Sequence, residues 1–414
     1  MARGGGTTTG ANRNAALDEM PGGPVTGSDG TTPGAHRLAA LDGLRGVAVL
    51  SVMAYHLVWA APEIAAPPFA QGGWVGVDVF FVLSGFLIGG LLLTEIDSTG
   101  GLSLPRFFAR RILRLYPAMV AFLVVGTWFA VAKDHLVLHR AWGTLQSAGL
   151  YYLNVELARH LQVVPSTFAH LWTLSVEFHF YLMLPVLFLA LHAVRAPRWA
   201  WAGVLTVAAA VVAVNRSVVF GEHASFTVPY VSTFTRLDAL LVGVLLALFR
   251  HQGWLRPPSP PRQVGSRGVQ ARQTGAGTVG SLVAAGAATA GAAWLAFVVW
   301  TTPADQAWLY HWGMVVDALA AAAVIWFLVA RPAAVVARVL ASPVPRWLGQ
   351  RSYALYLCHY VVYVAFQDHL DNLSPWVRAT LAPLTAFAIA ELSYRLVESP
   401  ALKLKARLSR APAV

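Results

Sequence analysis

Residues 74–94 read WVGVDVFFVLSGFLIGGLLLT, and Asp78 is the one charged residue in this run. An apolar segment of about 20 residues is long enough to cross the hydrocarbon core of a bilayer as a helix. Similar runs follow one another almost to the end of the chain, which predicts an all-α integral membrane protein. Ten spans are predicted, at residues 41–61, 74–94, 116–132, 170–191, 199–219, 228–249, 279–300, 308–329, 353–370 and 376–396.

The composition favours the same class. Hydrophobic residues make up 57% of the 414 and charged residues only 12%, about half the charged share of an average soluble domain. Lys and Arg number 30 against 19 Asp and Glu, and the excess lies in short loops, which is typical of the cytoplasmic side of an inner-membrane protein and not of a nucleic-acid binder. With ten spans these loops share one side, so we predict that both termini are cytoplasmic. The lone cysteine, Cys358, excludes an intrachain disulfide and a thiolate metal cluster.

Four of the segments outside the predicted spans have a distinctive composition. Residues 1–37, rich in Gly, Thr, Ala and Pro, are expected to form a disordered cytoplasmic tail. Residues 133–169 are too mixed for a clean span and predict an excursion on the outer face with a short re-entrant or interfacial helix. Residues 250–278 are expected to be a flexible cytoplasmic linker, and 401–414 a basic cytoplasmic tail.

Ionisable residues inside spans are costly and therefore mark candidate functional positions. Arg45 and His56 lie in the first span, eleven residues apart, which is about 16 Å along a helix. A neutral imidazole in the middle or outer half of the membrane can accept the proton of a substrate hydroxyl if another group orients it. Asp78 and Glu177, expected near the outer ends of their spans, are the two candidates for that role. The structural alternative is a buried His–carboxylate pair that only joins helices.

A second cluster is basic. Residues 106–117 read RFFARRILRLYP, and Arg110 and Arg114 share a helical face at the predicted cytoplasmic surface. Paired guanidiniums can bind phosphate, although such arginines also serve as a topology signal and contact lipid headgroups. Gly85 and Gly89 form a pair of small residues that predicts close helix packing.

Taken in order, these motifs resemble the membrane-bound acyltransferase 3 family, which includes bacterial O-antigen and polysaccharide O-acetylases and macrolide O-acyltransferases. The matching stretches are LDGLRG (41–46), the pair Arg45 and His56, GVDVFFVLSGF (76–86), RFFARR (106–111), HLWTLSVE (170–177), RLD (236–238) and SYALYLCH (352–359).

The resemblance implies a ten-span acyltransferase 3 domain over residues 38–400 that takes acyl-CoA from the cytoplasm. It makes His56 the essential family histidine and Arg45 its paired arginine, with Arg110 and Arg111 holding the coenzyme beside Arg114. The family pattern has Gln where this chain has His179, a departure expected to bear on the acceptor. The chain is similar to the stand-alone form, without an additional esterase-like domain.

The expected activity is transfer of an acyl group from acyl-CoA to a hydroxyl, with acetyl the commonest donor group in the family. The expected acceptor is a carbohydrate or a glycosylated small molecule. Membrane lipids surround the domain, and neither a metal nor a nucleic acid is expected. The competing hypothesis is a proton-coupled transporter or flippase of a glycan or small metabolite, because buried acids and histidines also suit proton coupling.

Overall fold

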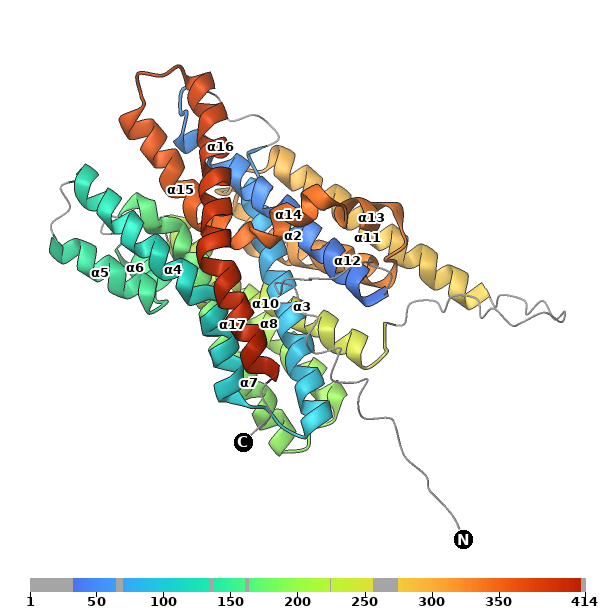
Figure 1. Ribbon diagram of the computed structural model, residues 1–414. Helices are drawn as coiled ribbons and strands as arrows, with labels where there is room; N and C mark the ends of the chain where they lie inside the picture. The colour runs from blue at the N-terminus through green and yellow to red at the C-terminus, as the bar shows by residue number, and fades with distance from the viewer. Residues whose placement is uncertain are drawn as a thin grey trace, which may run out of the picture.

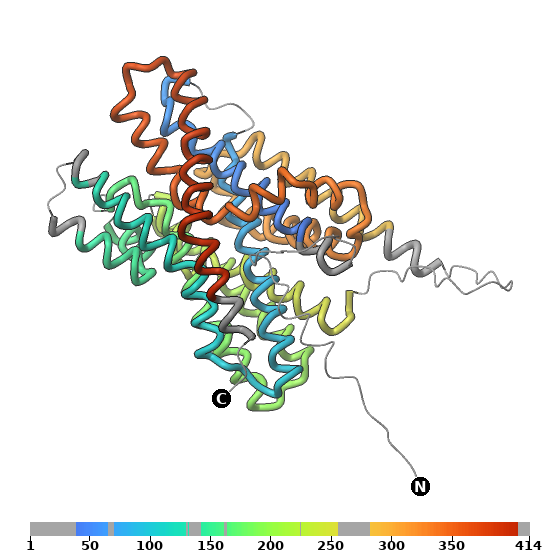
Figure 2. The backbone as a smooth tube through the Cα atoms, viewed as in Figure 1, coloured from blue at the N-terminus to red at the C-terminus, as the bar shows by residue number. Residues whose placement is uncertain are grey.

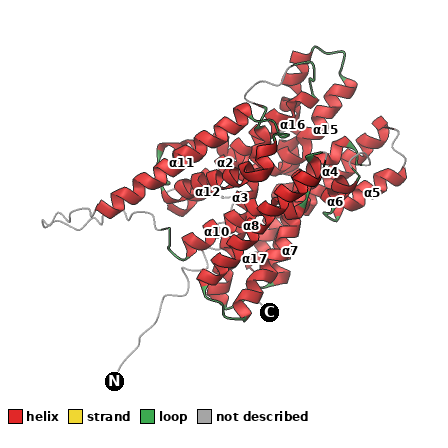
Figure 3. Cartoon of the chain, turned by 180° about the vertical axis from the view of Figure 1, so that it is seen from behind, coloured by secondary structure: helices red, strands yellow, loops and turns green. Residues whose placement is uncertain are grey.

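The computed structural model describes residues 33–64, 70–134, 138–160, 164–223, 225–255 and 275–410. Throughout these ranges the regular structure is helical, as Figure 3 shows. Ten long helices lie at the ten predicted spans: α2 (Pro33–His56), α3 (Gly76–Thr99), α4 (Leu104–Asp134), α7 (Trp172–Ala193), α8 (Arg198–Glu222), α10 (Thr233–His251), α11 (Gly275–Thr301), α12 (Met314–Ala330), α15 (Ser352–His369) and α16 (Pro375–Ser393).

In the described part of the chain, eight of these helices have both the length and the apolar composition of a membrane span. The two others, α15 and α16, are 18 and 19 residues long but carry more polar side chains. The all-helical membrane class predicted from the sequence is therefore confirmed, and the predicted number of spans is close to the number of suitable helices.

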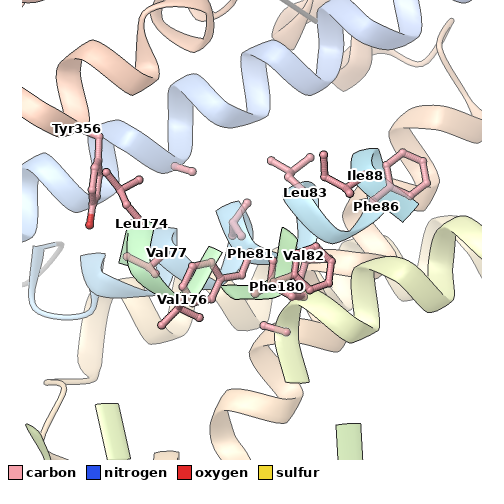
Figure 4. Packing of buried hydrophobic residues seen from close by; sticks show 14 of the residues in the cluster. Val77, Phe81, Val82, Leu83, Phe86, Ile88, Leu174, Val176, Phe180 and Tyr356 are labelled. Atoms are coloured by element: carbon pink, nitrogen blue, oxygen red, sulfur yellow. The ribbon is translucent and has the colours of Figure 1, made fainter. Parts of the chain in front are cut away.

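The centre of the bundle is α3, which packs against α10, α12, α2 and α7 (Figure 1). The predicted close approach at Gly85 and Gly89 is confirmed. A Cβ at Gly85 would clash with the carbonyl of Leu240, and one at Gly89 would lie 3.2 Å from the Cα of Val244, both on α10. Large apolar side chains fill the neighbouring space, and Figure 4 shows Val77, Phe81 and Val82 of α3 facing Leu174, Val176 and Phe180 of α7.

Shorter helices connect the spans. The stretch expected as an outer excursion with a short helix contains α5 (Leu138–Gly149), α6 (Leu153–Arg159) and a 3₁₀ segment, η4 (Ser166–Leu171). The apex between α5 and α6 is inserted beside α4, because the Tyr116 hydroxyl donates to the carbonyl of Gly149 at 2.7 Å. Two further helices, α13 (Val335–Leu340) and α14 (Pro343–Gln350), pack along the first half of α2.

Some predicted boundaries differ from the structure. Residues 1–32 of the expected tail and 256–274 of the expected linker lie outside the described residues, whereas α2 already begins at Pro33 and α11 at Gly275. The expected basic tail begins within an amphipathic helix, α17 (Ser399–Arg410), which packs against α4. A π-helical segment, η6 (Tyr394–Glu398), joins α16 to α17. Figure 2 shows α15 and α16 as a hairpin beside the end of α2.

Candidate active site

The position of α2 is fixed by glycines on opposite sides of it. A Cβ at Gly46 would lie 2.5 Å from the carbonyl oxygen of Pro345, and one at Gly76 of α3 would lie 2.5 Å from that of Ala48. The helix therefore touches backbone on both flanks, which fixes its rotation. His56 is its last residue and is followed by a 3₁₀ turn, η1 (Leu57–Trp59).

His56 belongs to a chain of hydrogen bonds that ends on a backbone carbonyl. Its Nδ1 lies 3.0 Å from Nε2 of His359 on α15. The Nδ1 of His359 in turn lies 2.9 Å from the carbonyl oxygen of Leu355. Because a carbonyl oxygen only accepts, Nδ1 of His359 carries the hydrogen, and Nε2 of a neutral His359 is an acceptor. His56 must then donate from Nδ1, which leaves Nε2 of His56 with the lone pair that a general base needs.

Aromatic rings surround this pair. Tyr55 and Tyr360 lie with ring centroids 5.1 and 5.0 Å from that of His56, and Trp59 packs 6.0 Å from Tyr360 with 43% of its surface exposed. His170 of η4 stacks on Tyr360 at 5.1 Å. An apolar wall with a few polar groups is typical of a small-molecule site, and the exposed indole marks its outer edge.

His56 contacts His359 and not the expected carboxylate. Asp78, one of the two expected carboxylates, is paired with an arginine instead. Its Oδ1 accepts a hydrogen bond from Nη2 of Arg236 at 2.6 Å, and both side chains are 1% exposed. A second buried pair, Arg216 with Asp238 at 2.6 Å, lies beside it on α8 and α10. Buried opposite charges compensate each other, so Asp78 joins α3 to α10.

Glu177 also lies elsewhere than expected. It accepts hydrogen bonds from Ser84 and, at 2.5 Å, from the hydroxyl of Tyr181. Its charge acts on Arg45 and Arg111, so Glu177 lies near the arginines.

The candidate donor-binding arginines fall into two groups. Arg110 is paired with Glu95 at 3.0 Å. Arg111 instead lies over the rings of Phe107 and Tyr181, at 5.7 and 5.6 Å from the centroids. Arg45 interacts electrostatically with Arg114. Asp42 and Glu177 also act on Arg45, so acids lie near these arginines, and Arg114 and Arg110 both act on Arg111. Guanidinium groups gathered in this way can bind an anionic ligand.

Two further contacts complete the geometry. Arg378 of α16 binds Glu63 at 2.6 Å and holds the pKa of that carboxyl below its ordinary value, which ties the segment after His56 to α16. His179 contacts Thr233 through Nδ1 at 2.7 Å and thereby links α7 to α10. Among the described residues, no group of three His, Cys, Asp or Glu side chains has the arrangement of a metal site.

The chain belongs to the acyltransferase 3 family, since the model of its acyltransferase domain matches residues 38–394. Three relatives illustrate the similarity. The peptidoglycan O-acetyltransferase OatA of Listeria monocytogenes is 30% identical over 370 residues, covering 87% of this chain and 55% of that protein. A putative O-acetyltransferase of Staphylococcus aureus is 29% identical, with coverages of 86% and 56%. A putative peptidoglycan O-acetyltransferase of Bacillus subtilis is 31% identical, with coverages of 86% and 54%.

The chain thus spans about half the length of the curated relatives it matches. No solved structure matches it. The similarity therefore covers the membrane domain described above and makes an acyl group the chemistry to test at the His56 site.

His359 and Glu398 were not predicted as site residues from the sequence. The available signal for His359 was its place at the end of the SYALYLCH stretch. Glu398 is buried at the end of η6, and its charge interacts with Arg114 and Arg45. Neither position could be paired from spacing, because the partners lie on helices far apart in the chain.

Proposed function

We propose that this chain is a membrane-bound O-acyltransferase that moves an acetyl group from acyl-CoA to a hydroxyl of a carbohydrate acceptor. The observation that carries the proposal is that α2 holds a histidine at one end and an arginine further along its length. One end presents His56 with an oriented lone pair, and eleven residues earlier Arg45 interacts electrostatically with Arg114. The acetyl group and the glycan acceptor are supported by the names of the relatives, of which one is a peptidoglycan O-acetyltransferase and another a putative one.

The donor is proposed to bind with its phosphates at Arg45, Arg111 and Arg114. About 16 Å of helix separates Arg45 from His56, a length comparable with an extended pantetheine arm. The arm would therefore carry the thioester from the arginines to the imidazole. Glu177, held by Ser84 and Tyr181, is proposed to line this passage.

The proposed reaction takes place at His56. Its Nε2 accepts the proton of the acceptor hydroxyl as the oxygen attacks the thioester carbonyl, and the C–S bond then breaks. The imidazolium returns that proton to the departing sulfur, which gives free coenzyme A and the ester. A base in hydrogen-bonding reach contributes about 10²–10⁴-fold in rate. Tyr360 and Trp59 are proposed to pack on the sugar ring.

The test uses purified protein in nanodiscs with acetyl-CoA and a soluble glycan fragment, with free thiol and esterified product measured together. We expect acceptor-dependent thiol release and loss of about 10²–10⁴-fold in His56→Ala. Unchanged turnover in a correctly inserted His56→Ala protein would overturn the proposal. A stoichiometric burst of thiol before acceptor is added would replace direct transfer by an acyl-histidine intermediate.

The orientation is proposed to place the arginine-rich end and both termini in the cytoplasm. The ends of three helices meet there, because Asp97 of α3 accepts from Arg198 of α8 and, at 2.6 Å, from His251 of α10. Basic residues favour the cytoplasmic side. A phosphatase fused to the C-terminus, active only outside the membrane, should be silent, and a fully active fusion would reverse the assignment.

A further inference from the structure

A buried carboxylate stands among the arginines assigned to the donor. Glu398 is 6% exposed, and its Oε1 has no hydrogen-bond partner among the described residues. It is the last residue of η6, which packs against α4. A π-helical turn changes the direction of the side chains that follow it and is frequent at functional sites. Here the turn delivers an acid into a basic cluster.

Charged and titratable groups face Glu398 from each neighbouring helix. Arg114 of α4, Arg45 of α2 and Arg351, which precedes α15, are the three cations that act on it. Arg351 is also bound by Glu391 through Nη2 at 3.2 Å.

Polar groups of α15 and of the π turn complete the surroundings. Tyr353 and Cys358 of α15 and Tyr394 of η6 interact electrostatically with Glu398. Arg395, also on η6, is 73% exposed and pairs with Glu391 instead. The cations therefore determine the charge state of Glu398 in competition with its burial.

These opposing effects place the pKa of the Glu398 carboxyl near neutral pH. Glu398 lies beyond α16, outside the predicted tenth span, and burial raises its pKa to about 7 against the attraction of Arg114, Arg45 and Arg351. A polyanionic ligand at the same arginines would weaken that attraction and add repulsion, and both changes favour the protonated acid. Binding of the anion and of a proton is then cooperative, and the coupling is reciprocal.

We propose that Glu398 is a protonatable member of the donor-phosphate site and takes up a proton when the phosphates of acyl-CoA bind at Arg45 and Arg114. This inference rests on the proposed function. The carboxylate balances the arginines while they hold no phosphate, and the proton comes from the cytoplasmic solvent. The carboxyl makes and breaks no bond to carbon, so its role is in binding and not in the transfer step.

Linkage between donor binding and protonation of Glu398 gives the direction of the expected pH effect. At pH 7 the carboxyl is about half protonated, so donor binding takes up about half a proton at this position. Between pH 6 and pH 8 the dissociation constant rises about tenfold from this group, because the ionised fraction that must be protonated grows. The phosphates of the coenzyme also titrate in this range, and their contribution cancels when variants are compared with the same ligand.

The experiment measures binding of desulfo-coenzyme A, which has no thiol, to the full chain in nanodiscs. Calorimetry in two buffers of different ionisation enthalpy gives the protons taken up. We expect Glu398→Gln to take up about half a proton less than wild type at pH 7, and to lose the tenfold pH effect. Glu398→Asp should keep both. Glu222→Gln, a change at an exposed position on α8, is the matched control and should behave as wild type.

The possible outcomes distinguish failure of this inference from failure of the proposed donor site. Binding with equal proton uptake in wild type and Glu398→Gln overturns this inference and leaves the donor site standing. Absence of binding in all four proteins overturns the proposed donor and this inference with it. Since Glu398→Asp retains a carboxyl, its loss of proton uptake in a protein that still binds would also count against the assignment.

Discussion

Replacement of His359 tests the chain of hydrogen bonds that orients His56. In His359→Leu the acceptor at 3.0 Å from Nδ1 of His56 is removed, while the volume and apolar surroundings are nearly kept. A buried N–H left without a partner costs about 1–3 kcal/mol. His56 avoids that cost by turning or by moving its hydrogen to Nε2, and either change removes the lone pair from the substrate.

This cost sets the expected magnitude. At about 1.4 kcal/mol per factor of ten, kcat should fall about 5- to 150-fold, which is less than the loss on removing the imidazole altogether. KM for acetyl-CoA should change little, because His359 is not among the residues assigned to the phosphates. His359→Gln should recover part of kcat, since its amide oxygen can accept from Nδ1 of His56.

The assay is steady-state release of coenzyme A thiol in nanodiscs, with thermal unfolding of each variant as the folding control. The expected order of kcat is wild type, His359→Gln, His359→Leu and His56→Ala. Wild-type kcat in a folded His359→Leu protein would refute the reasoning. Equal losses in the Gln and Leu variants would show that packing, and not hydrogen-bond acceptance, is what His359 contributes.

Three other predictions address the donor site and the bundle. Arg111→Ala should raise KM for acetyl-CoA about 10- to 100-fold with a smaller effect on kcat, because a charge-assisted hydrogen bond is lost equally in ground and transition states. Initial rates measured over a range of acetyl-CoA concentrations would show this rise, whereas an unchanged KM would leave Arg111 only a role as a topology signal. Gly85→Ala should lower the unfolding temperature in detergent because its Cβ meets backbone of α10, whereas Gly90→Ala has open space and serves as the control. Asp78→Ala should destabilise the protein by about 3–5 kcal/mol by leaving Arg236 unpaired, and a stable, inactive variant would instead support a catalytic Asp78.

The sequence was sufficient for features that depend on one helix at a time. Long apolar runs predicted where α3 and α7 form, and the spacing of Gly85 and Gly89 predicted a helix contact, because both signals repeat along a single chain segment. The distance from Arg45 to His56 was likewise available, since the two residues share α2 and its regular rise.

Contacts between side chains on different helices could not be predicted from the sequence in this way. His56 and His359 are 303 positions apart, and Asp78 and Arg236 are 158 apart. Pairing them requires the rotation and depth of each helix, which arise from packing of the whole bundle. A carboxylate was expected beside His56 because that partner is common for a catalytic imidazole. Asp78 instead compensates the buried Arg236, and Glu177 accepts hydrogen bonds from Ser84 and Tyr181.

The residue that contacts His56 affects how stable the protonated form of His56 is. A carboxylate beside His56 would stabilise the imidazolium and let it persist, whereas His359 offers only a neutral lone pair backed by the carbonyl of Leu355. A cation formed among buried rings with so little compensation is costly. In the proposed reaction the proton therefore stays on His56 only while the acyl group moves, and it then passes to the departing sulfur. In that reaction one histidine serves first as base and then as acid.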